Sequence, residues 1–202
     1  MTPYHYKRNG GFTLVEIAIV LVIIGLLLGG ILKGQELLTN AKIKRVVNDF
    51  NGITAAIYSY QDRYSALPGD DNMAESRWSG VCGNGGDGDG IIDGNWYSSS
   101  DNDETREIWG HLRAAGLING SKDNCKQPTH AFGGRIGIED TYAGLYGTVI
   151  CLEDIEGKIG EILDRQLDDG LINSGNVRGQ RVSGDNTKWD IDAGIYHVCK
   201  KL

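Results

Sequence analysis

The sequence has little proline, and the position of each proline is informative. Only three of its 202 residues are proline, and none lies between Phe12 and Leu67. Because proline breaks the interior of a helix, its absence permits one uninterrupted helix over this whole range. The 30 glycines lie mostly beyond that range and favour turns and loops in the rest of the chain.

Positive charge is also in deficit, and the motifs of the common enzyme classes are missing. The chain has 20 Lys and Arg against 27 Asp and Glu, a formal net charge of -7, which argues against a general nucleic-acid binder. It has no Gly-x-Ser-x-Gly elbow, no His-Glu-x-x-His and no phosphate-binding glycine loop. The carboxylates of residues 84–103 have no partner motif for glycoside hydrolysis, so we interpret them as solvated surface. We predict that the protein is not an enzyme and has no nucleic-acid partner.

What the sequence does contain is an apolar block from Phe12 to Leu32, long enough to span a bilayer. Lys7 and Arg8 precede it and favour a cytoplasmic N-terminus, although the basic residues after the block oppose that orientation. A cleaved secretory signal peptide is the alternative, with small residues for a cleavage site in "LLLGGILKG".

Glu16 is the feature that a signal peptide does not explain. A carboxylate inside an apolar segment is costly, and such groups usually have a partner. The position therefore indicates a second group that is not part of the apolar block itself.

The stretch "GGFTLVEIAIVLVIIG" resembles the prepilin signature of type IV pilins and type II secretion pseudopilins. The resemblance implies that a prepilin peptidase cuts between Gly11 and Phe12 and methylates the new N-terminal Phe12. It also implies that Glu16 pairs with the N-terminal amine of a neighbouring subunit inside the filament. Many pilins have a helix proline near the place of Lys33 in this sequence, so the resemblance leaves open whether this stem unwinds on assembly.

Beyond the apolar block, the spacing predicts that the same helix continues as an amphipathic one. The stretch "LPGD" at 67–70 ends the helix near Ala66. Before it, six apolar residues follow a 4-3-4-3-4 pattern: Val46, Phe50, Ile53, Ile57, Tyr60 and Tyr64. We therefore predict an α+β, pilin-like fold in which a long N-terminal helix packs against an antiparallel sheet. The expected segments are a leader (1–11), a membrane and filament-core half-helix (12–33), an amphipathic half-helix (34–66) and a globular head (67–202).

Within the head, residues 101–116 predict a short helix capped by Asp101 or Asp103 and stopped by Gly116. Residues 154–167 predict another helix. The stretches "GRIGIE", "AGLYGTVICL" and "DAGIYHVCK" predict strands, with a polar loop or hairpin over residues 173–190.

Four cysteines lie beyond the apolar block: Cys82, Cys125, Cys151 and Cys199. An even number of cysteines after an export signal favours two disulfides. Three pairings are possible, and we favour Cys82 with Cys125 and Cys151 with Cys199. Reduced, buried cysteines and a zinc site that uses His197 and Cys199 are the alternatives.

The glycine- and aspartate-rich stretch at residues 80–96 offers oxygen ligands for calcium: Asn84, Asp87, Asp89 and Asp93. The first ligand and the final bidentate glutamate of the EF-hand template are both missing. We therefore favour a series of solvated Asx and glycine turns, with no cofactor required and calcium kept as an alternative.

The resulting hypothesis is a structural subunit of a type IV pilus-like filament, held in the bacterial inner membrane with its head in the periplasm before assembly. The alternatives are a type II secretion pseudopilin, a membrane-anchored calcium-binding module outside any filament, and an anchored periplasmic enzyme. The resemblance implies four kinds of partner: other copies or other pilins, a prepilin peptidase, an assembly platform protein and a cytoplasmic ATPase.

Overall fold

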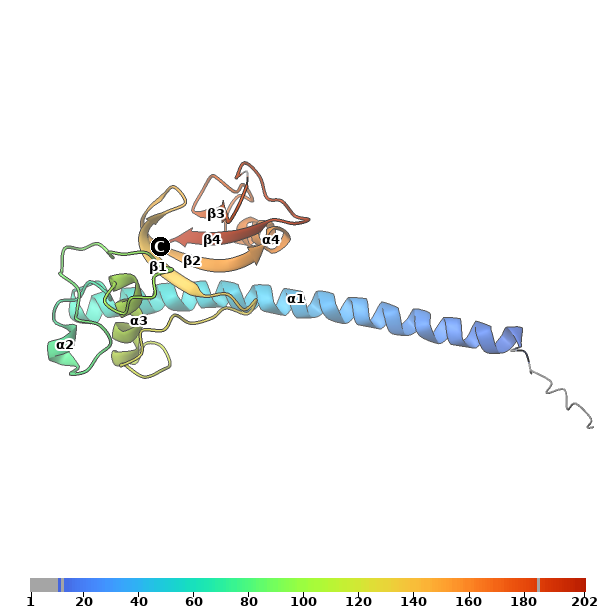
Figure 1. Cartoon of the computed structure of the whole chain (residues 1–202), viewed down its shortest axis with the longest axis horizontal. Coiled ribbons are helices and arrows are strands. Elements are labelled where there is room, and N and C mark those ends of the chain that lie inside the picture. Colours follow the sequence, from blue (N-terminus) through green and yellow to red (C-terminus); the bar gives the residue numbers. More distant parts are fainter. Residues whose placement is uncertain (1–10, 12, 185) are drawn as a thin grey trace, which may run out of the picture. The chain divides into compact units, whose positions relative to one another are not determined.

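The computed structural model describes residues 11, 13–184 and 186–202, and it contains four helices and four strands within them. In chain order these elements are α1 (Leu14–Tyr64), α2 (Ala74–Arg77), α3 (Glu104–Ala114), β1 (Ile136–Tyr142), β2 (Leu145–Glu156), α4 (Gly157–Leu167), β3 (Val177–Arg181) and β4 (Ile195–Lys201) (Figure 1). The chain divides into two units, Met1–Ala41 and Lys42–Leu202. The expected leader lies outside the described residues except for Gly11.

The first unit contains the apolar part of α1. Every large apolar side chain from Leu14 to Leu38 is exposed, and the first buried side chain of the helix is Ile43. A helix that is apolar on all sides is stable only where lipid or other protein covers it.

The remaining part of α1 is the central element of the second unit. Val46, Phe50, Ile53, Ile57 and Tyr60 are buried, as the 4-3-4-3 spacing predicted, and Tyr64 packs at the edge of the same core. The helix ends at Tyr64, two residues before the expected end. Ser65 follows with a φ of 53°, a left-handed conformation that stops the helix before the Leu67–Pro68 bond does.

Four antiparallel strands form one sheet in the order β1-β2-β4-β3. In the view of Figure 1 the sheet and α4 lie along one side of the second half of α1. Side chains from α1, α3, α4 and the sheet share one hydrophobic core, which confirms the α+β, pilin-like prediction.

The prediction of a helix from residue 154 was wrong by three residues. Ile155 and Glu156 pair with Tyr196 and Ile195, so β2 continues to Glu156 and α4 begins at Gly157. Asp154 has a φ of 54° at a register shift between Leu152 and Ile155. This bulge places Ile155 in the core, and the sequence pattern alone does not distinguish it from the first turn of a helix.

Two disulfides join Cys82 to Cys125 and Cys151 to Cys199, which is the favoured sequential pairing. Cys151 and Cys199 are opposite each other on β2 and β4 and are fully buried, so this bridge ties the last strand to the longest one. Cys82 and Cys125 tie together the segments before and after α3. Since all four sulfurs are in disulfides, neither reduced cysteines nor a zinc thiolate site is present.

Candidate functional site

The start of α1 brings together the residues at the centre of the proposed signature. Thr13 immediately precedes the helix, and its backbone N–H and its Oγ1–H both donate to Oε2 of Glu16, at 2.8 and 2.9 Å. In return, the N–H of Glu16 donates to Oγ1 of Thr13 at 3.2 Å. This reciprocal arrangement is a capping box, in which Thr13 and Glu16 satisfy backbone donors that the first turn of the helix leaves free.

The capping box uses only one of the two carboxylate oxygens. Among the described residues, Oε1 of Glu16 accepts no hydrogen bond, and the whole side chain is exposed. Glu16 can therefore cap its own helix and still accept a bond from a group outside the chain. Thr13 was not among the residues predicted from the sequence, although the pattern Thr-x-x-Glu before an apolar run is typical of a capping box.

The two residues of the expected cleavage point differ in what the structure says of them. Gly11 is exposed, and no other described residue has an atom within 4 Å of the place where a side chain would begin. Phe12 lies outside the described residues. The expected cleavage therefore stays a prediction. On the leader side of the bond, Gly11 is exposed.

The helix that follows is long and apolar enough to cross a membrane, judged by length and composition alone. Signal sequences and buried core helices can pass the same test, but here the apolar segment has no side chain buried within the protein. A membrane, or a filament of other helices, would cover these side chains.

The expected calcium ligands lie on an exposed loop, and the structure gathers only part of the set. Carboxylate oxygens of Asp87 and Asp89 lie within 4.8 Å of each other and of one from Asp70, which the sequence analysis did not include. Asp93 belongs to no such group of carboxylates among the described residues. Residues 84–93, called the acidic loop below, thus do not bring the four predicted ligands to one point.

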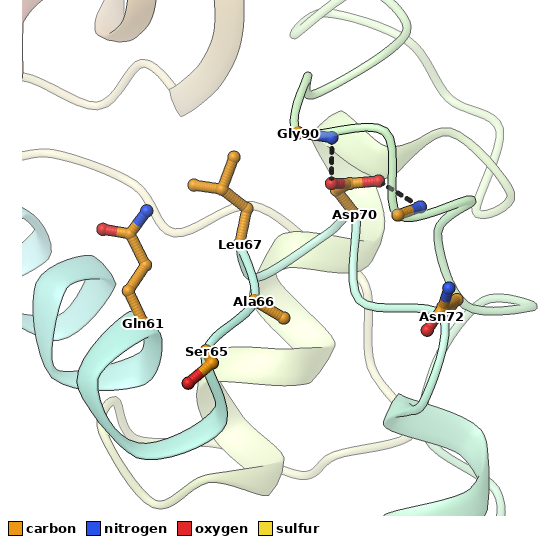
Figure 2. A pocket seen from close by; sticks show the side chains of 8 residues that line it. Gln61, Ser65, Ala66, Leu67, Asp70, Asn72 and Gly90 are labelled. Atoms are coloured by element: carbon orange, nitrogen blue, oxygen red, sulfur yellow. Dashed lines mark hydrogen bonds between the residues drawn. The ribbon is translucent and has the colours of Figure 1, made fainter.

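Asp70 has a different role, because it binds the backbone of the acidic loop. It is 3% exposed, its Oδ1 accepts the N–H groups of Gly88 and Asp89, and its Oδ2 accepts the N–H of Gly90 at 2.8 Å. Figure 2 shows the carboxylate of Asp70 directed at the backbone N–H of Gly90. A carboxylate that accepts several backbone amides is well satisfied without a cation.

Two buried glutamates of α3 bind the same loop in the same way. The two oxygens of Glu104 accept the N–H groups of Asp87 and Asp93, at 3.1 and 2.8 Å. Oε1 of Glu107 accepts the N–H of Asn84 at 2.7 Å. The loop therefore turns its amides inward to buried carboxylates, while the side chains of Asp87 and Asp93 are exposed.

The burial of these carboxylates shifts their protonation equilibria. Burial raises the pKa of Glu107 to about 7, and the nearby charge of Glu104 adds to the effect. Among the described residues, no group donates a hydrogen bond to Oε2 of Glu107, which leaves its ionised form poorly compensated. Burial also raises the pKa values of Asp70 and Glu104, against the opposing effect of the loop amides.

A cleft of about 430 Å³ lies between the end of α1 and the acidic loop. Figure 2 shows Gln61, Ser65, Leu67, Asp70 and Asn72 around it. Asp70 is the only charged residue in its lining, and both of its oxygens already accept loop amides. Asp70 therefore serves to position the loop at the edge of the cleft.

One comparison with known proteins bears on the start of α1. Residues 6–32 match the family model described as the prokaryotic N-terminal methylation motif. The matched range includes the Gly11–Phe12 bond, Glu16 and the apolar block, and it supports the signature of type IV pilins and pseudopilins. Neither a curated protein nor a solved structure shows significant similarity to the chain.

The buried carboxylates predict an unusual pH dependence of stability. A glutamate has a pKa near 4.5 in the unfolded chain, and folding raises that of Glu107 to about 7. Its protonation therefore stabilises the fold at low pH, and this contribution is lost as the pH rises through 7. We expect Glu107→Gln to remove about 3 kcal/mol of the difference in unfolding free energy between pH 4.5 and pH 8.

Chemical denaturation of the full chain in detergent micelles, followed by tryptophan fluorescence, measures this difference. Glu156→Gln is the matched control because it changes an exposed glutamate outside the acidic loop. An unchanged pH slope in Glu107→Gln would contradict the role given to this carboxylate.

Proposed function

We propose that the chain is a structural subunit of a type IV pilus-like filament, processed by a prepilin peptidase and polymerised through the first half of α1. The observation that carries the proposal is Glu16, set in a matched N-terminal methylation motif at the start of an uncovered apolar helix. A pilin-type motif implies both the processing and the polymerisation.

In this proposal, cleavage after Gly11 creates a new ammonium group on Phe12, one residue before Thr13. The capping box survives cleavage, because Thr13 keeps its amide N–H in the mature chain. The free oxygen of Glu16 then accepts a bond from the ammonium of a neighbouring copy. An ion in an apolar core is costly without a partner, so pairing fixes the axial position of each added subunit.

The proposal also assigns a location and partners to the protein. Before assembly, α1 anchors the subunit in the bacterial inner membrane with the N-terminus in the cytoplasm and the head in the periplasm. Assembly would use a platform protein and a cytoplasmic ATPase, and the filament would contain copies of this chain or of other pilins. The same chemistry serves a type II secretion pseudopilin, which is the alternative within this class.

A membrane-anchored module outside any filament is the alternative from another class. It would use the apolar helix only as an anchor, and the free carboxylate oxygen of Glu16 would have no role. An anchored enzyme has no support from the cleft, whose one carboxylate is already bonded.

The consequence of Glu16 for assembly is directly testable. We expect Glu16→Ala to lower the polymerised fraction roughly 100-fold, because it leaves the ammonium of the neighbouring subunit unpaired in an apolar core. Shearing of producing cells, followed by immunoblots of filament and envelope fractions, measures this fraction. The head should retain both disulfides and its protease resistance.

Glu36→Ala is the control for this test, because Glu36 is an exposed glutamate of the same helix that pairs with Lys33. It should assemble as the wild type does. Normal assembly of Glu16→Ala would refute the proposed role and would favour the plain anchor.

We also propose that the head folds without a cofactor. The acidic loop is already held by the carboxylates of Asp70, Glu104 and Glu107, so it needs no cation to order its backbone. Removing calcium with EDTA should therefore leave the Tm of the full chain in micelles unchanged. A rise of several degrees on adding millimolar calcium, abolished by Asp87→Asn together with Asp89→Asn, would instead establish a calcium site near Asp70.

A further inference from the structure

A groove of about 490 Å³ runs beside the head half of α1, away from the cleft described above. Its apolar lining comes from four parts of the head: Ile53 of α1, Trp109 of α3, Ile118 of the loop after α3, and Ile136 of β1. Arg45 and Arg113 also line it. A groove of this size accommodates one or two side chains of another molecule.

The charge at the rim of the groove is positive and incompletely neutralised. Arg113 donates hydrogen bonds to the backbone carbonyls of Asn119, Asn124 and Lys126, and it has no carboxylate partner among the described residues. Arg45 is exposed, and Asp49 is the one acidic residue in the groove within the part of the chain that the structure describes. The groove therefore fits an apolar side chain flanked by negative charge.

The acidic loop of the same protein presents such a group. Ile91 is 44% exposed, while the next residue, Ile92, is anchored in the core at 2% exposure. Asp89 and Asp93 are exposed on either side of Ile91. An exposed isoleucine between two aspartates is complementary in shape and in charge to an apolar groove between two arginines.

The backbone around Ile91 is held rigidly. The N–H of Gly90, before it, donates to Asp70 and the N–H of Asp93, after it, donates to Glu104. The N–H of Ile91 itself donates to Asp89 at 2.8 Å. A side chain presented from such a fixed turn loses little conformational entropy when it binds, which favours affinity.

A helical polymer needs two different, mutually complementary surfaces on each subunit, because its interfaces are head-to-tail. We propose that the groove receives Ile91 from a second copy of this chain, with Asp89 and Asp93 of that copy against Arg45 and Arg113. This inference rests on the proposed function and adds a contact between heads to the contacts made by the apolar half of α1.

The two surfaces are separated along α1, which sets the offset between the copies. Asp49 lies in the groove, and Asp70, which holds the acidic loop, follows the end of α1 at Tyr64. The helix rise between Asp49 and Tyr64 gives roughly 22 Å. Since Gly90 of the acidic loop lines the same cleft as Gln61 and Ser65, the proposed contact joins copies displaced by roughly this distance along the helix axis.

Photo-cross-linking in cells that produce filaments tests the contact. A photoreactive amino acid replaces Ile91 in the full-length chain, and the control places it at Leu171, an exposed apolar residue of another head loop that is 61% exposed. We expect cross-linked multimers from position 91, with the attached peptides from residues 45–53 or 109–119. The control should give no cross-links to these peptides.

Each other result overturns the inference in a recognisable way. Filaments with no cross-link from position 91, with cross-links to other parts of the chain, or with cross-links to a different protein would refute this contact and leave the filament function intact. A failure of the wild-type chain to form filaments at all would refute the proposed function, and this inference with it.

A charge exchange provides a second, independent test. Arg45→Glu and Asp93→Arg alone should each lower the polymerised fraction about fivefold, because each replaces an attraction with a repulsion. The double variant should return to within about twofold of the wild type. Asp62→Arg, on an exposed face of α1, is the control for added positive charge. Single variants that assemble normally, or a double variant that fails to recover, would contradict the proposed contact.

Discussion

The carboxylate of Glu16 lies at the start of a helix whose next 16 residues are all apolar or glycine, and an ionised group in such surroundings needs a partner. Within the chain, Thr13 supplies two donors, but both go to the same oxygen. The other oxygen is available to another molecule. We propose that the ammonium group of a neighbouring subunit donates to this free oxygen of Glu16. That bond would fix the register at which subunits stack in the filament.

The remainder of α1 shows how one helix serves two environments. Up to Leu38 its apolar side chains are exposed, and from Ile43 a narrower stripe is buried in the head. The change from an apolar cylinder to an amphipathic helix lets the first half enter a membrane or filament core while the second half holds the head. The two disulfides and the sheet then stabilise the head.

Much of this organisation was readable from the sequence. The stripe from Val46 to Tyr60 and the strands β1, β2 and β4 follow from local periodicity, and the structure shows each of them. The helix ends before Pro68, as expected, but Ser65 stops it two residues earlier than the proline predicted. The start of α4 was misplaced because Asp154 forms a bulge, and a bulge depends on the register of the partner strand. The support of the acidic loop was missed for a related reason: Asp70, Glu104 and Glu107 are distant from the loop in sequence or belong to other elements, and only the tertiary fold aims them at its amides.

The central claim is that the chain is processed as a prepilin, and the intact mass of the mature protein tests it most directly. Mass spectrometry of protein recovered from sheared surface material and from the envelope gives that mass, together with the N-terminal sequence. The account predicts a chain that begins at N-methylated Phe12 and is four hydrogens lighter than the reduced form, as two disulfides require. A chain that begins near Lys33, or one that retains Met1, would contradict it.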